Sequence, residues 1–380
     1  MTDQADQTFD VAIVGGGPGG CATALSLRQH DPSISVVLLE ATDYAQPRIG
    51  ETLPPPTRQL LEHLGVWDQF LLQSHQPVHG TSAAWGQIQP ADNDFLLTTG
   101  GTGWHVDRAA FDAMLCQAAQ LRGTTVIRNT QFKDATRVGA EEPSPSPGKT
   151  PRWRLHLANQ TDLNARIVID ATGRSASFSR RQGATVQSLD RLVGICQFRE
   201  NRHHDPRTMV EATADGWWYT ASLPQNQRIV AFMTDADIAS TLRLTEPDRW
   251  QQQLAATVQT SEIAGQSRPL ARLFVRPIES RCLSPAAGTD WLAVGDAAST
   301  FDPLSSQGIL KALRGGIFAS YAIADLLSKR DPTGLDRYRS FIVSEFSSYA
   351  TIRARYYGDE QRWPEHPFWK RRHSMTAALL

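Results

Sequence analysis

A glycine-rich turn near the start of the chain restricts the fold more than any other feature. Residues 9–14, which are apolar except for Asp10, are typical of a buried strand, and the sequence GGGPGG follows, beginning at Gly15. In such a loop Gly15 permits a tight turn, Gly17 lets the backbone approach a pyrophosphate, and Gly20 lets the next helix pack on the strand. The loop therefore predicts a site for a dinucleotide.

The elements after this loop have the spacing that a dinucleotide site requires. Pro18 opens a predicted helix, whose N-terminus offers N–H groups and the positive end of its dipole to phosphates. A second strand is predicted over residues 34–39, and Glu40 ends it about 20 residues after the loop, where an acid should accept ribose hydroxyls. Strand, loop, helix, strand and acid are in register for a Rossmann-like unit.

Composition excludes several other classes of function. The chain has 380 residues, enough for one large or two fused domains, and its net charge of −1 does not indicate a nucleic-acid partner. The four cysteines are scattered without a CxxC pair, which predicts neither a metal site nor disulfides and fits a reducing, cytoplasmic compartment. The short polar start and the lack of a long apolar run predict neither a signal peptide nor a membrane span.

Hydrophobic periodicity predicts an interleaved rather than a sequential organisation. Helices are expected over residues 57–72 with a stop at Gly65, 107–121, 247–259, 308–327 and within 334–380. Strands are expected over residues 126–127, 153–157, 166–170, 192–198, 217–223, 228–234 and 270–277, with a hairpin tip at 141–151. We expect a discontinuous dinucleotide-binding domain (1–75, 105–190, 285–330), an inserted antiparallel-sheet substrate domain (76–104, 191–284) and a C-terminal helical segment (331–380).

A second loop lies almost 300 residues further along the chain. Gly295 and Asp296 follow a predicted strand, and the sequence FDPLSSQGI then begins at Phe301. Further motifs are RIGETLPP from Arg48, WHVDR from Trp104, DATGRS from Asp170 and GWWY from Gly216. In this order, and over nearly the whole chain, they resemble the single-component FAD proteins typified by aromatic hydroxylases and flavin-dependent halogenases. The resemblance implies an α/β fold of the aromatic hydroxylase or glutathione reductase type, with FAD as cofactor.

The same resemblance implies roles for individual residues. Asp296 would accept a ribityl hydroxyl, and the backbone of Pro303, Ser305, Gln307, Gly308 and Ile309 would lie beside the isoalloxazine. A helix beginning near Gly308 can stabilise an anionic reduced flavin through its dipole. Arg48 and Arg108 are candidates for phosphate contacts, because guanidinium groups suit phosphate, although either residue could instead form a surface ion pair. Phe132, Ala171, Gly173 and Gly295 complete the expected cofactor-binding set.

Candidate catalytic and substrate-contacting residues come from the remaining motifs. His105 could act as an acid or base near the flavin, or be a structural histidine before a helix. Glu51 could face the flavin, or serve as a capping or ion-pairing carboxylate. Ser305 and Ser306 are catalytic candidates in the second loop. Trp217 and Trp218 alternate on a predicted strand, so that one should face a substrate pocket and the other the core or solvent.

The chain departs from the pattern of the halogenases at several positions, and these differences indicate which subgroup of FAD proteins it resembles. Tryptophan halogenases use a lysine in a tunnel beyond the flavin, whereas this chain has no lysine before Lys133, and Lys311 follows the flavin loop. Ser305-Ser306 stands where those enzymes carry Glu-Ser, and their Trp-x-Trp-x-Ile-Pro segment is represented only by GWWYTASLP. These differences argue against halogenation.

A closer resemblance is to the flavoproteins that mature tryptophylquinone enzymes. It rests on residues 301–313 and on the aromatic and arginine-rich tail from Tyr356 to Arg372. It implies hydroxylation of a tryptophan in the precursor of a quinone-dependent oxidase or amine dehydrogenase, by a C4a-hydroperoxyflavin. Molecular oxygen and a reductant, either NAD(P)H or an external reductase, would be required. A small-molecule aromatic hydroxylase, a halogenase and a non-catalytic FAD-binding chaperone remain alternatives.

Overall fold

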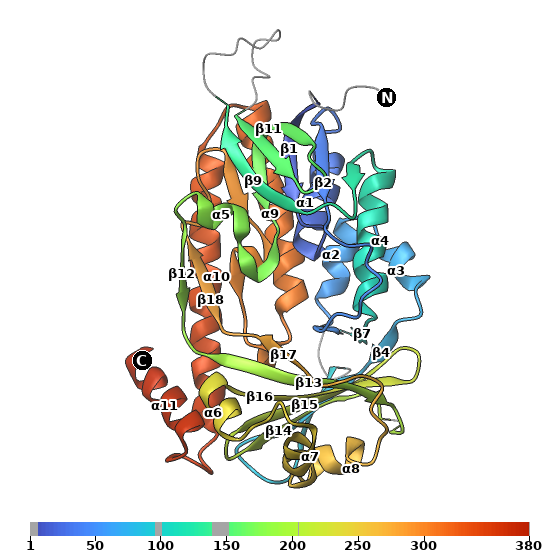
Figure 1. Cartoon of the computed structure of the whole chain (residues 1–380), viewed down its shortest axis with the longest axis vertical. Coiled ribbons are helices and arrows are strands. Elements are labelled where there is room, and N and C mark those ends of the chain that lie inside the picture. The colour runs from blue at the N-terminus through green and yellow to red at the C-terminus, as the bar shows by residue number, and fades with distance from the viewer. Residues whose placement is uncertain (1–6, 96–100, 139–151, 204, 380) are drawn as a thin grey trace.

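The computed structural model describes residues 7–95, 101–138, 152–203 and 205–379. One sheet forms the upper half of the molecule in Figure 1, a second sheet forms the lower half, and long C-terminal helices run beside both. The hairpin tip expected at residues 141–151 lies outside the described residues. Among the residues that are described, no helix has both the length and the apolar composition needed to cross a membrane.

The first sheet has the strand order β8-β2-β1-β11-β10-β9, and β19 also pairs with β11. The strands are β1 (Thr8–Val14), β2 (Val36–Leu39), β8 (Thr125–Ile127), β9 (Phe132–Arg137), β10 (Trp153–Leu157), β11 (Asp162–Asp170) and β19 (Trp291–Ala293). β1, β2, β8, β11 and β19 pair in parallel, which explains why β2 is a continuous buried apolar run and why β1 is buried from Phe9 to Val14.

The register of the parallel strands brings three distant loops together. Val14 is paired with Asp170, and Asp170 is paired in turn with Ala293. The three loops that follow β1, β11 and β19 therefore leave the sheet at one edge. Open α/β sheets bind ligands at this carboxyl edge.

Three helices cover the first sheet at this edge. α1 (Pro18–His30) packs between α4 (Arg108–Leu121) and α9 (Gly308–Ser328). Asp107 caps α4 by accepting hydrogen bonds from the N–H groups of Ala109 and Ala110. Shorter helices are α2 (Thr57–His63), α3 (Trp67–Leu71), α5 (Ser177–Arg181) and the 3-10 helices η3 (Gly173–Ser175), η4 (Gly295–Ala297) and η5 (Pro303–Ser305).

The second sheet has the order β17-β13-β16-β15-β14-β5-β6 and is mostly antiparallel. Its strands are β5 (Gly80–Ala84), β6 (Ala91–Asp94), β13 (Leu192–Glu200), β14 (Thr208–Thr213), β15 (Gly216–Leu223), β16 (Gln227–Asp235) and β17 (Phe274–Pro277). α7 (Pro247–Ala255) packs Trp250 against Trp218 and Phe232 on one face of this sheet. α6 (Ala236–Thr241) and α8 (Gln259–Ala264) lie nearby, as Figure 1 shows.

Two small sheets complete the fold. One consists of β3 (Thr52–Leu53), β7 (Gly103–His105) and β4 (Gln76–Val78), and the other of β12 (Thr185–Ser188), β18 (Arg281–Ser284) and β20 (Ser299–Thr300). The α/β architecture agrees with the sequence-based expectation, whereas the domain boundaries given above remain predictions.

Some element boundaries differ from the sequence-based expectation. The stop expected at Gly65 within residues 57–72 is confirmed, because Gly65 has a φ of +62° and separates α2 from α3. The helix expected over residues 247–259 ends at Ala255, and α8 follows as a separate helix. β14 was not expected, because its sequence TMVEAT alternates only weakly.

The C-terminal helices connect the two sheets. α10 (Thr333–Asp359) runs along one side of the molecule, so that Tyr338 donates a hydrogen bond to the Ala293 carbonyl of the first sheet. At its other end Tyr357 packs with Trp217 of the second sheet. α11 (Pro367–Leu379) then buries Phe368 and Trp369 in the same apolar cluster. Part of the aromatic and arginine-rich tail is thus core of this chain.

The burial of Trp369 leads to a testable prediction. Trp369→Ala should lower the free energy of unfolding by about 3–5 kcal/mol, the usual cost of deleting a large buried aromatic side chain. Tyr356→Ala is the control, because Tyr356 is 54% exposed and Trp369 is 0% exposed. Urea denaturation measures both. Equal and small effects would show that α11 does not contribute to the core.

Candidate active site

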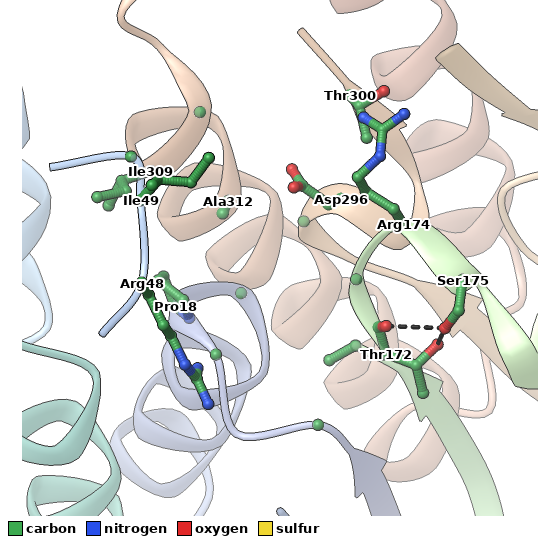
Figure 2. A pocket seen from close by; sticks show the side chains of 18 of the residues that line it. Pro18, Arg48, Ile49, Thr172, Arg174, Ser175, Asp296, Thr300, Ile309 and Ala312 are labelled. Atoms are coloured by element: carbon green, nitrogen blue, oxygen red, sulfur yellow. Dashed lines mark hydrogen bonds between the residues drawn. The ribbon is translucent and has the colours of Figure 1, made fainter. Parts of the chain in front are cut away.

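A cavity of about 950 Å³ lies at the carboxyl edge of the first sheet and extends to the second sheet. In Figure 2 Pro18, Arg48 and Ile49 lie on one side of it, and Thr172, Arg174 and Asp296 on the other. The expected cofactor-binding residues that line the cavity are Gly15, Gly17, Pro18, Gly20, Glu40, Arg48, Arg108, Phe132, Ala171, Gly173, Gly295, Asp296, Pro303, Gly308 and Ile309. Ser305 and Gln307, also in the expected set, are not among its lining residues.

The glycines of the first loop serve two different purposes. A Cβ atom on Gly15 would overlap the carbonyl oxygen of Ala171, and one on Gly20 would overlap the carbonyl oxygen of Gly15. A Cβ atom on Gly17, by contrast, would meet no protein atom within 4 Å. Gly15 and Gly20 are therefore required by packing, whereas Gly17 leaves open space in front of the α1 N-terminus. No side chain caps that N-terminus, so its N–H groups suit a phosphate.

Glu40 organises the loop as well as lining the cavity. Its Oε2 atom accepts a hydrogen bond from the Gly16 N–H at 2.9 Å, and its Oε1 atom accepts one from the Thr42 N–H at 3.0 Å. The Tyr44 hydroxyl donates to the Gly16 carbonyl at 2.8 Å. The carboxylate thus holds the loop against the end of β2, and its contact with ribose hydroxyls remains a prediction.

Arg48 and Arg108 share one buried acid. Both guanidinium groups pair with Asp112, whose side chain is 0% exposed, at distances of 2.9 and 3.1 Å to Oδ2. Arg108 also donates hydrogen bonds to the carbonyls of Ile49 and Gly50. The structure therefore contains the ion pairs that were the alternative to phosphate contacts. Their shared acid, Asp112, is buried at the cavity wall and not on the surface. Phosphate contacts by either arginine remain predictions.

The second loop forms another part of the wall. Asp296, on η4, is half exposed and accepts a hydrogen bond from the Lys311 ammonium at 2.9 Å. Lys311 is buried and donates a further hydrogen bond to the Ser299 carbonyl at 2.5 Å. A Cβ atom on Gly308, at the start of α9, would meet no protein atom within 4 Å. The N-terminus of α9 is therefore open to a ligand.

The two serines of this loop have different positions. Ser306 lines the cavity and adopts a left-handed backbone conformation with φ of +51°. Ser305 turns away, and its hydroxyl donates to the Asp302 carbonyl at 2.9 Å. Gln307 is the residue immediately before α9.

The far end of the cavity rests on the second sheet. Alternate residues of β13, β15 and β16 form this floor, namely Gly194, Cys196, Tyr219, Ile229, Ala231 and Met233. Arg276, Pro277 and Ile278 continue it. The floor is mostly apolar and includes small residues, so it suits a flat apolar group.

The expectation that Trp217 or Trp218 lines the pocket is wrong. The two rings do lie on opposite faces of the sheet, but both are buried away from the cavity. Trp217 donates a hydrogen bond from Nε1 to the Tyr357 hydroxyl at 2.9 Å, because α10 and α11 cover that part of the sheet. Trp218 stacks on Phe232 with ring centroids 4.8 Å apart. The neighbouring Tyr219 lines the cavity instead.

Glu51 and His105 have contrasting environments. Glu51 lines the cavity, is 3% exposed and accepts a hydrogen bond from the Gly50 N–H at 2.7 Å. Burial raises the pKa of this carboxyl, although hydrogen bonds to it, including one with Tyr219, act in the opposite direction. His105 does not line the cavity; burial and then the Arg228 charge lower its pKa to about 3. Its Nε2 atom hydrogen-bonds the Thr208 hydroxyl at 2.9 Å, as expected for a structural histidine.

Several site residues were missed at the level of sequence. Asp112 follows Arg108 by four residues on a predicted helix, and that spacing could have indicated the ion pair. Cys196, Tyr219 and Met233 alternate correctly on predicted strands, but the sequence does not say which face meets the cavity. Arg174 belongs to the DATGRS motif, and the structure places it at the cavity wall, paired with Glu279 from a distant segment that the sequence did not indicate.

Comparison with known proteins identifies the family. The family model described as an FAD binding domain matches residues 8–341. This chain belongs to that family. LodB of Marinomonas mediterranea, named as an FAD-dependent oxidoreductase, is 31% identical over 376 residues, covering 98% of each chain. Together these matches make the protein a flavin-dependent oxidoreductase with FAD as its cofactor.

Solved structures show the same fold. The myxobacterial chondrochloren halogenase CndH superimposes with a TM-score of 0.86 at 20% identity, covering 96% of this chain and 86% of that one. The peptidyl tryptophan dihydroxylase QhpG, essential for tryptophylquinone cofactor biogenesis, has a TM-score of 0.74 at 24% identity, covering 96% of this chain and 78% of that one. At these identities the likeness concerns the fold and not the substrate.

The cavity residues fit FAD. The open space at Gly17 and the uncapped α1 N-terminus suit the pyrophosphate, and the open space at Gly308 gives access to the α9 N-terminus. Bound FAD supplies the redox chemistry of the site. The two loops would hold the cofactor between them, and the apolar floor on the second sheet lines the rest of the same cavity.

The open space at Gly17 gives a prediction about cofactor binding. Gly17→Val should leave the fold intact, because the residue has an extended backbone with φ of −75° and nothing within 4 Å of its Cβ. It should weaken FAD binding by on the order of 100-fold, since the side chain takes the space of the pyrophosphate.

Gly20→Val is the matched control, because its side chain would overlap the Gly15 carbonyl and should unfold the loop itself. Flavin absorbance after gel filtration and circular dichroism separate the two effects. A Gly17→Val protein that retains FAD at wild-type affinity would contradict this assignment.

The environment of His105 gives a prediction about pH. Its pKa is about 3 in the fold, against 6.5 for an ordinary histidine, so the unfolded state binds the extra proton between these values. The stability that neutral His105 contributes is present above pH 6.5 and is lost as the pH falls toward 3. Relative to His105→Gln, the wild-type free energy of unfolding should therefore fall by about 1.4 kcal/mol per pH unit below 6.5. Urea denaturation at pH 7 and pH 5 measures this; parallel pH profiles would refute it.

Proposed function

We propose that this protein hydroxylates a tryptophan side chain in a precursor protein during the formation of a tryptophylquinone cofactor. The observation that carries the proposal is the floor on the second sheet, where apolar and small side chains continue the FAD cavity beyond the flavin loop. An electron-rich ring on this floor would lie between the sheet and the residue 301–306 loop. The choice of tryptophan in this proposal follows the activity of QhpG, a peptidyl tryptophan dihydroxylase, and the resemblance of residues 301–313 and the C-terminal tail to the flavoproteins that mature tryptophylquinone enzymes.

The chemistry balances with the cofactor and two small co-reactants. One oxygen atom of O₂ enters the ring as a hydroxyl group, and the other leaves as water. A reductant, either NAD(P)H or an external reductase, provides the two electrons. The site must keep bulk water from the flavin while this occurs.

Glu51 is the residue best placed to assist the ring. It lines the cavity together with Thr52 and Tyr219, whose hydroxyls are 2.8 Å apart. Because burial raises its pKa, its carboxylate is a stronger proton acceptor than an exposed one. In this proposal Glu51 accepts a hydrogen bond from the indole N–H and takes up the proton released when the ring becomes aromatic again.

Lysine placement gives no support to the halogenase alternative. Lys311 is buried, and its ammonium group is already bonded to Asp296 and the Ser299 carbonyl. Lys133 lines the cavity but comes from β9 of the first sheet, beside Phe132, rather than from the second sheet. Neither residue lies on the strands that form the apolar floor.

The decisive experiment is co-expression with a precursor of a quinone-dependent oxidase, followed by mass spectrometry of its tryptophan-containing peptides. We expect a mass gain of one oxygen atom per hydroxylation that requires this protein. Ala231→Leu, which fills the floor, should reduce modification at least about tenfold without loss of FAD. Ala255→Leu, on the exposed side of α7, is the matched control and should have no effect.

Three other results would replace the proposal. Efficient turnover of a small free aromatic compound, with no change in any precursor, would indicate a small-molecule hydroxylase. A halogenated product formed in the presence of chloride or bromide would indicate a halogenase. Bound FAD without oxygen insertion into any substrate would indicate a chaperone.

A further inference from the structure

The loop between β20 and α9 depends on one buried carboxylate. Asp302 lies in this loop, between Phe301 and Pro303, and all three residues line the cavity. The Asp302 side chain is 0% exposed, and its Oδ1 atom accepts a hydrogen bond from the Leu304 N–H at 3.0 Å. Its Oδ2 atom accepts hydrogen bonds from residues of a different element, α10. The conformation of the 301–306 loop therefore depends on the residues that bind Asp302 Oδ2.

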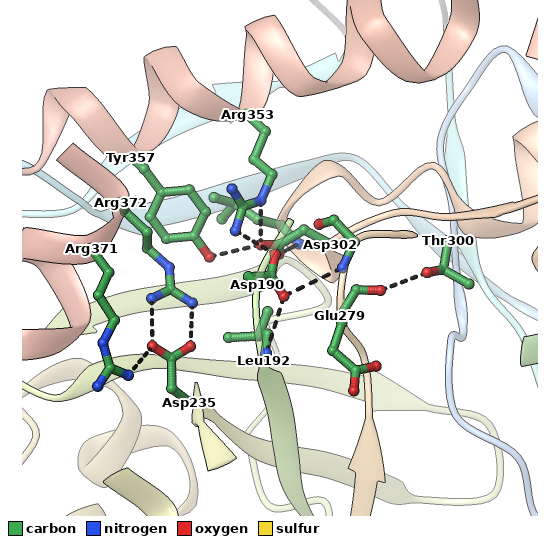
Figure 3. A network of polar contacts seen from close by, with 12 residues as sticks. Asp190, Leu192, Asp235, Glu279, Thr300, Asp302, Arg353, Tyr357, Arg371 and Arg372 are labelled. Atoms are coloured by element: carbon green, nitrogen blue, oxygen red, sulfur yellow. Dashed lines mark hydrogen bonds and ion pairs between the residues drawn. The ribbon is translucent and has the colours of Figure 1, made fainter. Parts of the chain in front are cut away.

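The partners of this loop come from one face of α10. Tyr349, Arg353 and Tyr357 are spaced by four residues, so their side chains project from the same face of the helix. Arg353 donates from Nε to Asp302 Oδ2 at 3.2 Å, and the Tyr357 hydroxyl donates to the same oxygen at 2.8 Å (Figure 3). The Asp302 N–H donates to the Tyr349 hydroxyl at 2.6 Å. Both the side chain and the backbone of Asp302 are thus bound by α10.

Aromatic packing adds a second connection at Tyr349. Its ring stacks on Phe301 with centroids 4.0 Å apart and an interplanar angle of 2°. Its hydroxyl also shares a hydrogen bond with Ser280 at 2.7 Å. The position of Phe301 at the cavity wall is therefore set by α10 as well.

The same network reaches the second sheet. Arg353 donates a hydrogen bond from Nη2 to Asp190 at 2.7 Å, just before β13. The Tyr357 hydroxyl, which donates to Asp302, accepts the Trp217 Nε1–H bond at 2.9 Å. Arg372 of α11 lies over the Tyr357 ring and pairs with Asp235 at 2.8 Å (Figure 3). The Tyr357 hydroxyl therefore connects the second sheet, which forms the cavity floor, to the 301–306 loop.

The loop needs such support because its own conformation is unfavourable. Ser306 has φ of +51°, a left-handed conformation that costs a residue other than glycine about 1–2 kcal/mol. Backbone conformations of this kind persist where the surrounding structure holds them. The bonds from α10 to Asp302 provide that restraint four residues before Ser306.

We infer that Tyr349, Arg353 and Tyr357 are positioning residues, which set the geometry of the 301–306 loop against the flavin ring and thereby the reactivity of bound FAD. None of the three is a catalytic residue, because each acts through Asp302 or Phe301. The inference rests on the placement of this loop beside the isoalloxazine in the proposed function, and it does not depend on which ring is hydroxylated.

The test removes single hydroxyls without removing rings. Tyr357→Phe deletes the bond to Asp302 Oδ2, and Tyr349→Phe deletes the acceptor of the Asp302 N–H while keeping the stack on Phe301. Both holoenzymes should show an altered visible spectrum of bound FAD, a shifted reduction potential, and a rate of reoxidation by O₂ changed by about threefold to tenfold without any substrate. The spectrum, the reduction potential and the reoxidation rate are properties of bound FAD. They can therefore be measured whether or not the protein hydroxylates a precursor.

Tyr338→Phe is the matched control. Tyr338 is also buried on α10, and its hydroxyl donates to the Ala293 carbonyl at 2.7 Å, outside the loop. It should lose similar stability but leave the flavin spectrum and potential unchanged. Unchanged flavin properties in both test variants, or an equal change in Tyr338→Phe, would overturn the inference. If Tyr357→Phe does not fold, Tyr349→Phe carries the same test, since the two hydroxyls bind different atoms of Asp302.

Discussion

The parallel register of β1, β11 and β19 is the constraint on which the rest of the site depends. Pairing of Val14 with Asp170, and of Asp170 with Ala293, places the ends of three strands at one edge, although they are separated by more than a hundred residues in sequence. The glycine loop, the segment from Ala171 to Gly173 and the Gly295–Asp296 turn then surround one cavity. A slip of one residue in either pairing would turn alternate side chains to the opposite face and separate these loops.

Buried acids held by arginine are the second recurring feature. Asp112 is bound by Arg48 and Arg108, Asp302 by Arg353, and Asp235 by Arg372. A guanidinium group presents several donors in a rigid plane, so one arginine can bind an acid and a second acceptor at the same time. Arg353 does this by joining Asp302 to Asp190. The pairs of Arg48, Arg353 and Arg372 thus connect separate segments of the chain.

Local patterns predicted those parts of the site that one segment forms alone. The roles of Gly15, Gly17 and Gly20 follow from the space around each, and the helix after Asp107 begins where its capping side chain indicates. Predictions were wrong where the sequence had to indicate which side chains of a strand meet the cavity. Trp217 and Trp218 alternate as expected, yet α10 and α7 cover them, and Tyr219 meets the cavity. For His105 the sequence left two alternatives, and the structure favours the structural one, with the ring buried and bonded to the Thr208 hydroxyl.

The sequence by itself determined that this chain binds a dinucleotide cofactor, because the glycine loop, its flanking strands and the second flavin loop carry their geometry within short segments. Tertiary structure alone decided which residues of the second sheet line the cavity and which residues hold the 301–306 loop. The floor combines β13, β15 and β16, and the support of Asp302 comes from a helix about 50 residues away. Contacts of this kind depend on how sheets and helices pack, and periodicity within one segment does not encode that arrangement.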